Sequence, residues 1–154
     1  MRKTLALAIA FTITAAVAGA QKVMMPSQTN NPNIKISPVS AEEQALASAK
    51  RIKRDEALKL VAANKAVFVD VRSLDSFNRK HIKGAVSIPG SQLPSRMREV
   101  PPGKMAITYC ACVEEHTAAR AVLQMKSRGN TNAAALIGGW NEWVALGLPT
   151  EGRK

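Results

Sequence analysis

The two cysteines of the chain, Cys110 and Cys112, are the residues whose type and spacing most clearly indicate chemistry. A single residue separates them, so they cannot cross-link distant parts of the chain as structural disulfides do. A bond between them would close a very small ring, which we expect to be easily reduced. The pair therefore indicates a reactive site rather than a covalent scaffold.

The neighbouring segments place this pair in a loop between a strand and a helix. The apolar run Met105–Tyr109 predicts a strand, and the pattern from Thr117 to Arg128 predicts a helix that Gly129 ends. The first turn of a helix presents unpaired N–H groups and a partial positive charge, which stabilise a thiolate or a persulfide anion. Sulfur chemistry suits this position.

The candidate binding loop consists of the residues between the cysteines and this helix, namely Val113, Glu114, Glu115, His116 and Thr117. The two carboxylates would disfavour a nearby thiolate and repel an anion such as thiosulfate. The alternative is that they point into solvent or cap the helix. His116 is the only group in the loop that can become a cation.

Strands alternate with short helices along the chain, which predicts an α/β domain with a mostly parallel sheet. The expected strands are near 52 and at 66–71, 86–88, 105–109 and 133–137; the expected helices are at 55–63, 73–80, 91–99 and 117–128, with a last one carrying Trp140 and Trp143. In the helix at 55–63, Ala57, Leu58 and Val61 are expected to share the apolar face. Ligands of such sheets bind beyond the carboxyl ends of the strands, where the cysteines lie.

The first twenty residues have the features of a secretory signal peptide. A basic pair at positions 2 and 3 precedes an apolar run at 5–17, and the small residues at 18–20 suit signal peptidase. We expect cleavage after Ala20 and a periplasmic or secreted mature protein. The alternative is an uncleaved membrane anchor, for which the run is short.

The segment at 21–50 is expected to be a flexible tether, because residues 22–38 are rich in Pro, Asn, Ser and Gln. Ser40 and Glu43 have the spacing of a capping box, which predicts a short helix at 41–50. The domain itself is expected at 51–152.

The net charge of the 154-residue chain is +11, and removal of the basic pair at positions 2 and 3 leaves about +9. Such a surface attracts anions. Zinc-ligand spacing and nucleic-acid-binding motifs are absent from the sequence, so we expect no nucleic-acid partner. We also expect a monomer that does not bind a membrane after signal cleavage.

Several short segments follow one another in a distinctive order. They are Phe68-Val69-Asp70-Val71-Arg72, the stretch from Asp75-Ser76-Phe77 through His81-Ile82-Lys83-Gly84-Ala85 to Ile88-Pro89, Tyr109-Cys110, Gly138-Gly139-Trp140-Asn141-Glu142-Trp143 and Gly147-Leu148-Pro149. Each is weak alone, but the ordered set is specific. From Arg51 to Gly152 the chain resembles the rhodanese family.

This resemblance implies a rhodanese-like fold: a five-stranded, mostly parallel sheet with helices on both faces, and a loop whose backbone amides ring a cysteine sulfur. Family enzymes take sulfane sulfur from a donor such as thiosulfate, hold it as a cysteine persulfide and pass it to cyanide or a thiol. The implied ligand is a small sulfur-containing anion or a thiol, and neither a metal nor an organic cofactor is needed.

Five further residues gain roles from the resemblance. Asp70 and Arg72 match an acidic-x-Arg pair that supports the loop and adds positive charge; the alternative is a buried ion pair that only orients the fold. His81 matches a histidine that usually bonds to backbone. Trp140 and Trp143 are expected to fill the core and the rim of the site.

The cysteine spacing departs from the family pattern. Counting forward from the strand at 105–109 selects Cys110 as the nucleophile, whereas counting back six residues from the helix selects Cys112. The difference is an insertion of two residues. Either thiol, or a relay between them, fits the sequence.

The leading hypothesis is a rhodanese-type sulfurtransferase or persulfide carrier. A second is a non-catalytic rhodanese module that binds a partner or an anion. A third is a thiol redox or metal site built from Cys110, Cys112 and His116, since thiols and imidazole bind soft metals.

Overall fold

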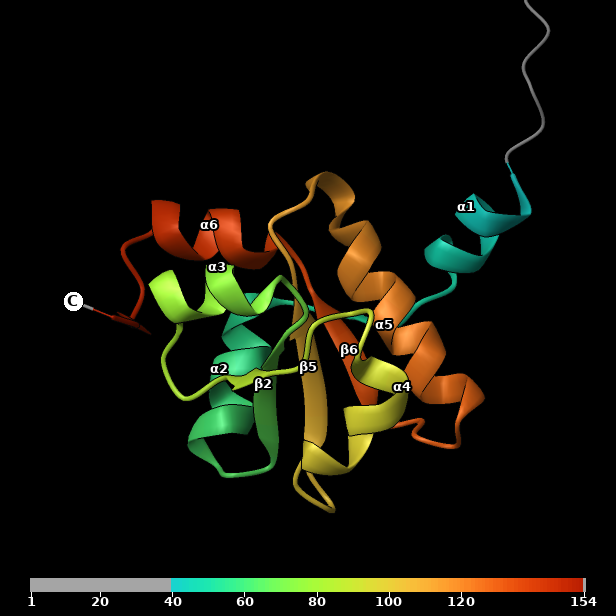
Figure 1. Ribbon diagram of the computed structural model, residues 1–154, viewed down its shortest axis with the longest axis horizontal. Helices are drawn as coiled ribbons and strands as arrows, with labels where there is room; N and C mark the ends of the chain where they lie inside the picture. Colours follow the sequence, from blue (N-terminus) through green and yellow to red (C-terminus); the bar gives the residue numbers. More distant parts are fainter. Residues whose placement is uncertain (1–39, 154) are drawn as a thin grey trace, which may run out of the picture. The chain divides into compact units, whose positions relative to one another are not determined.

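The structure, a computed structural model, describes residues 40–153 (Figure 1). Its helices are α1 (Ala41–Ala47), α2 (Arg54–Ala62), α3 (Leu74–Arg79), α4 (Leu93–Arg96), α5 (His116–Ser127) and α6 (Gly139–Ala145), with 3₁₀ turns η1 (Met97–Glu99) and η2 (Val113–Glu115). Its strands are β1 (Arg51–Ile52), β2 (Ala66–Asp70), β3 (His81–Ile82), β4 (Val86–Ser87), β5 (Met105–Tyr109), β6 (Ala133–Leu136) and β7 (Thr150–Glu151). The predicted signal peptide at 1–20 and the predicted tether up to residue 39 lie outside the described residues.

One sheet contains β1, β6, β5, β2 and β4 in that order, and every neighbouring pair is parallel. The predicted α/β class and five-stranded sheet are confirmed. β2 and β5 pair from Ala66 with Met105 to Asp70 with Tyr109. This register brings Asp70 and Tyr109 together at the carboxyl edge, directly before Cys110.

Side chains of the central strands alternate between two apolar clusters. In β2, Val67 and Val69 contact the cluster that includes residues of α4 and α5, whereas Ala66 and Phe68 contact the cluster that includes residues of α2 and α6. Figure 1 shows these helix pairs on opposite sides of the sheet. The strands are therefore buried on both faces, as β-branched apolar runs in parallel sheets are.

The helical faces agree with the sequence pattern in α5 and differ in α2. Ala121, Val122 and Met125 of α5 are buried as predicted. In α2, Ala57 is buried but Leu58 is exposed. The prediction for Leu58 is wrong because it lies about 100° around the helix from Ala57; the packed positions follow the i, i+3, i+4 pattern instead.

The predicted capping box before α1 is confirmed. The Ser40 side chain accepts from the backbone N–H of Glu43, and the Glu43 carboxylate accepts from the backbone N–H of Ser40. No packing partner for this helix could be predicted from the sequence. In the structure Leu46 is buried in the core cluster of α5, and Glu42 pairs with Arg120. Residues 41–47 therefore pack on α5.

A second, two-stranded sheet was not predicted. β3 and β7 pair antiparallel, His81 with Glu151 and Ile82 with Thr150. Strands of two residues are too short to show alternation in the sequence. Among residues 40–153, helices long and apolar enough to cross a membrane are absent.

Candidate active site at the end of strand β5

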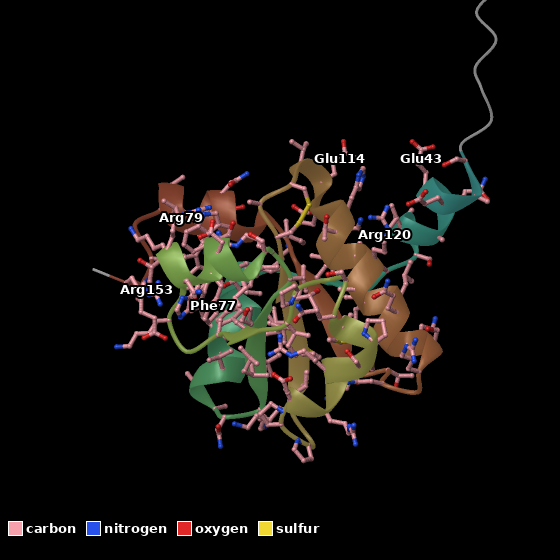
Figure 2. The ribbon with its side chains drawn as sticks, viewed as in Figure 1. Glu43, Phe77, Arg79, Glu114, Arg120 and Arg153 are labelled. Carbon is pink, nitrogen blue, oxygen red and sulfur yellow. A yellow bond between two sulfur atoms is a disulfide. The ribbon has the colours of Figure 1, made fainter. Side chains whose placement is uncertain are left out.

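The two cysteines are joined by a disulfide beside the first turn of α5, at the same end of the helix as Glu114 (Figure 2). Cys110 directly follows β5 and is only 3% exposed within the core cluster of α5. Cys112 is half-buried at the edge of that cluster. Their Cα atoms are 5.6 Å apart, a distance that a disulfide spans without backbone movement.

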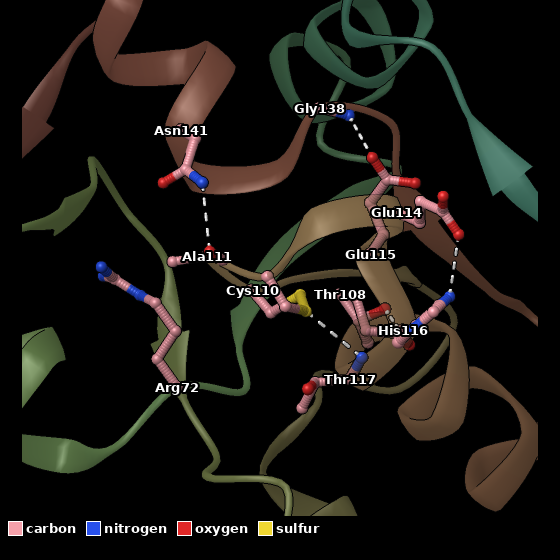
Figure 3. Close-up of a disulfide and its surroundings, with 12 residues drawn as sticks. Arg72, Thr108, Cys110, Ala111, Glu114, Glu115, His116, Thr117, Gly138 and Asn141 are labelled. Carbon is pink, nitrogen blue, oxygen red and sulfur yellow. Dashed lines mark hydrogen bonds and ion pairs between the residues drawn. A yellow bond between two sulfur atoms is a disulfide. The ribbon is translucent and has the colours of Figure 1, made fainter.

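The sulfur of Cys112 lies at the N-terminus of α5. It accepts a hydrogen bond from the backbone N–H of Thr117, with a nitrogen–sulfur distance of 3.4 Å (Figure 3). Counting forward from the strand thus selects Cys110, which directly follows β5. Counting back from the helix selects Cys112, which contacts the N-terminus of α5. Among residues 40–153, Thr117 provides the one backbone amide that donates to a cysteine sulfur, so the expected ring of amides is not formed around the disulfide.

The loop before α5 has an unusual backbone. Glu114 and Glu115 both adopt left-handed conformations, with φ of 57° and 54°. Residues other than glycine enter this region at a cost of about 1–2 kcal/mol each. Contacts around the loop must therefore offset this cost.

The two glutamates have different surroundings. The Glu114 side chain is 75% exposed and pairs with His116 at 3.2 Å, which agrees with the predicted alternative of a solvent-facing carboxylate. The Glu115 side chain is 16% exposed, accepts the backbone N–H of Gly138 at 2.8 Å and lies 3.9 Å from Arg51. Glu115 therefore neither faces solvent nor caps α5 with its side chain; it ties the loop to the turn between β6 and α6.

The start of α6 holds the backbone between the cysteines. The backbone N–H of Trp140 donates to the Cys110 carbonyl at 2.8 Å, and the Asn141 side chain donates to the Ala111 carbonyl at 3.1 Å (Figure 3). Gly139 makes the close approach possible, because a Cβ atom there would lie 2.5 Å from the Cys110 oxygen. The glycine pair at 138–139, noted in the sequence, thus serves the cysteine segment.

Asp70 and Arg72 form a buried network at the same edge. The Asp70 carboxylate is fully buried and accepts from the Arg72 guanidinium at 2.6 Å and from the Tyr109 hydroxyl at 2.7 Å. Burial, and then the charge of Asp70, raise the pKa of Tyr109 far above its ordinary value. Tyr109 therefore stays protonated, and its hydroxyl donates a hydrogen bond to Asp70.

The Arg72 guanidinium links this network to the aromatic residues beside the site. Its carbon lies 4.1 Å from the ring centroid of Trp140, which stacks on Tyr109 at 6.4 Å. Trp143 is buried and donates its indole N–H to the Pro149 carbonyl. Trp143 thus packs in the core and Trp140 packs at the rim, as predicted.

His81 lies in the β3–β7 pair. Its Nδ1 is 2.8 Å from the Phe77 carbonyl and its Nε2 is 3.3 Å from Glu151. The backbone N–H of Gly84 lowers the pKa of Glu151 below its ordinary value, which keeps that carboxylate ionised. The predicted hydrogen bond of His81 to backbone is confirmed.

A cleft of about 470 Å³ opens beside the loop. Its walls come from the ends of β2 and β4 and from α5, and they include Arg72, Ser73, Ser91, Thr117, Arg120 and Gln124. The charge of Arg72 is offset by the buried Asp70 carboxylate. Arg120 is half exposed and gives the cleft a positive charge, which Glu42 partly offsets. Thr117 belongs both to the wall and to the hydrogen bond of the Cys112 sulfur.

The metal-site hypothesis gains no support from the described part of the chain. Within residues 40–153, clusters of three or more His, Cys, Asp or Glu side chains with metal-binding geometry are absent. The two sulfurs bond to each other, and His116 pairs with Glu114.

Replacing Glu115 with alanine is expected to lower the free energy of unfolding by about 1–3 kcal/mol, because the N–H of Gly138 loses a charged acceptor. Glu114→Ala is the matched control, since Glu114 has the same backbone conformation but an exposed side chain. That variant should change stability by at most about 1 kcal/mol. Urea unfolding of the two variants measures the difference, and equal effects would contradict the role given to Glu115.

Comparison with known proteins identifies the fold. The model of the rhodanese-like domain family matches residues 53–146. The chain belongs to this family. The structure resembles the crystal structure of a full-length protein from Lactobacillus plantarum, with a TM-score of 0.60 and 27% identity over 67% of this chain and 88% of that one.

A second crystal structure, a thiosulfate sulfurtransferase from Pseudomonas aeruginosa, has a TM-score of 0.62 and 26% identity over 72% of this chain and 22% of that one. In sequence, the chain is 35% identical over 79 residues to YqhL, an uncharacterised protein of Bacillus subtilis, covering 51% of this chain and 61% of YqhL. The chain thus spans less than two thirds of that relative.

Proposed function

We propose that this rhodanese-like protein is a sulfurtransferase or persulfide carrier, and that Cys112 carries the sulfur. The observation behind the proposal is the hydrogen bond from the Thr117 amide to the Cys112 sulfur at the N-terminus of the twelve-residue helix α5. A helix N-terminus favours an anionic sulfur. Cys110 has an apolar surrounding instead, which disfavours a charge.

The chemistry starts from the reduced pair, which an external thiol or dithiol produces from the disulfide. The Cys112 thiolate attacks the outer sulfur of a donor such as thiosulfate, forming a sulfur–sulfur bond. The donor's own sulfur–sulfur bond breaks and its electron pair leaves with sulfite. A nucleophile, cyanide or a thiol, then removes the outer sulfur from the persulfide and regenerates the thiolate.

The cleft beside the loop supports a small anionic donor. Arg120 lies on the wall of the cleft and supplies an exposed positive charge, which Glu42 partly offsets. On the loop, the exposed carboxylate is that of Glu114, which lies 3.2 Å from the His116 ring. Arg120 therefore attracts an anionic donor, whereas the Glu114 carboxylate repels it.

The test is mass spectrometry of the reduced full-length chain after incubation with thiosulfate or inorganic polysulfide. Cys110→Ala should gain one sulfur atom, and Cys112→Ser should gain none. The two variants form a matched pair, since each keeps one thiol. If Cys110→Ala takes up no sulfur from either donor, the proposed function is wrong and a binding role remains for the domain.

A further inference from the structure

The two cysteines differ in what can reach them. Cys110 is 3% exposed, and its carbonyl is held by the Trp140 N–H, so neither its side chain nor its backbone faces solvent. Cys112 is half-buried and lies beside Thr117, which lines the cleft. A donor or acceptor that enters from the cleft therefore meets Cys112 first. Cys110 can react only with a group that is already bound to Cys112, or with Cys112 itself.

The sulfur of Cys112 always lies within reach of Cys110. The backbone places the Cα atoms of Cys110 and Cys112 5.6 Å apart, and the two sulfurs are bonded. The contacts of Trp140 and Asn141 with the carbonyls of Cys110 and Ala111 fix this segment from outside. The reduced pair thus keeps its two sulfurs as neighbours, with a persulfide on Cys112 close to the Cys110 thiol.

We propose that Cys110 discharges the persulfide on Cys112 and releases its outer sulfur as hydrogen sulfide, closing the disulfide seen in the structure. This inference rests on the proposed function. The Cys110 sulfur attacks the inner sulfur of the persulfide, so that the Cys110–Cys112 bond forms and the bond to the outer sulfur breaks. The outer sulfur leaves with the electron pair and takes the thiol proton of Cys110, becoming hydrosulfide.

The electrons of this step come from the protein itself. Cys110 is oxidised from thiol to disulfide, and the sulfane sulfur is reduced to sulfide. One turnover therefore needs no other reagent, and each further turnover needs a dithiol or thiol reductant that reopens the disulfide. Cys110 therefore supplies the electrons that reduce the sulfane sulfur, and the external partner of the protein is a thiol or dithiol reductant.

The experiment uses reduced full-length chain without oxygen, loaded with inorganic polysulfide and freed at once from excess donor and reductant. Free sulfide and the mass of the protein are then followed in time. Wild type should release one sulfide per persulfide and end as the disulfide, two hydrogens lighter than the reduced chain. In Cys110→Ala the persulfide should persist at least about tenfold longer, with sulfide release reduced to the same extent.

Cys110→Ser serves as a second variant in case alanine disturbs the core, and circular dichroism establishes that each variant is folded. Equal persulfide lifetimes in wild type and in a folded Cys110 variant would overturn the inference while leaving the proposed function intact. Disulfide formation without stoichiometric sulfide would overturn it as well. If wild type and both Cys110 variants take up no sulfur, the proposed function and the inference both fail.

Discussion

Replacing Asp70 with alanine is expected to lower the free energy of unfolding by about 3–5 kcal/mol, the largest stability effect that the structure predicts. The fully buried carboxylate accepts hydrogen bonds from Arg72 and Tyr109. Its removal leaves a guanidinium with a 10% exposed side chain and a buried hydroxyl without their acceptor. Asp70→Asn keeps the size and one acceptor oxygen, so it should cost less than Asp70→Ala. Urea unfolding measures both variants.

The matched control is Asp75→Ala. Asp75 also pairs with an arginine, Arg79, but both of these side chains are mostly exposed. An exposed pair contributes at most about 1 kcal/mol. If the Asp70 and Asp75 variants unfolded with the same loss of stability, the buried network would not be the support of this edge of the sheet.

Replacing Gly139 with alanine is expected to lower the free energy of unfolding by about 2–5 kcal/mol and to displace the cysteine segment. Gly139 has a φ of 49°, for which a Cβ atom costs about 1–2 kcal/mol. That Cβ would also lie 2.5 Å from the Cys110 oxygen, and overpacking of this kind costs about 1–3 kcal/mol. The rate of persulfide formation should fall as well, since the start of α6 holds Cys110 and Ala111.

Gly147→Ala separates the two causes. Gly147 has a φ of 64°, but a Cβ atom there would have open space around it. This variant should lose only about 1–2 kcal/mol and should load sulfur at the wild-type rate. Wild-type loading by Gly139→Ala would show that the contact between α6 and Cys110 does not position the site.

The sheet and the main helices could be predicted because their signals are local. The run at Ala66–Asp70 and the buried positions of α5 follow from apolar patterns within a few residues. The capping box of α1 is also a local pattern, at Ser40 and Glu43. The position of Cys110 at the end of a strand follows from the same reading.

The separate surroundings of the two cysteines could not be predicted, because they depend on contacts between distant residues. Glu115 bonds to Gly138, which lies 23 positions away in the chain. The left-handed backbone of Glu114 and Glu115 has no signal in residue type, since glycine or asparagine usually marks such positions. The sequence left Cys110 and Cys112 equivalent, and the contact with Thr117 distinguishes them.

The most direct test of the account locates the transferred sulfur in wild-type protein. Trypsin should place both cysteines in one peptide, Met105–Arg120, and fragmentation on either side of Ala111 separates them. The reduced chain is exposed briefly to donor, alkylated at once and digested. We predict that the extra sulfur is found on Cys112, the residue at the N-terminus of α5. Its appearance on Cys110 at the earliest times would contradict this account.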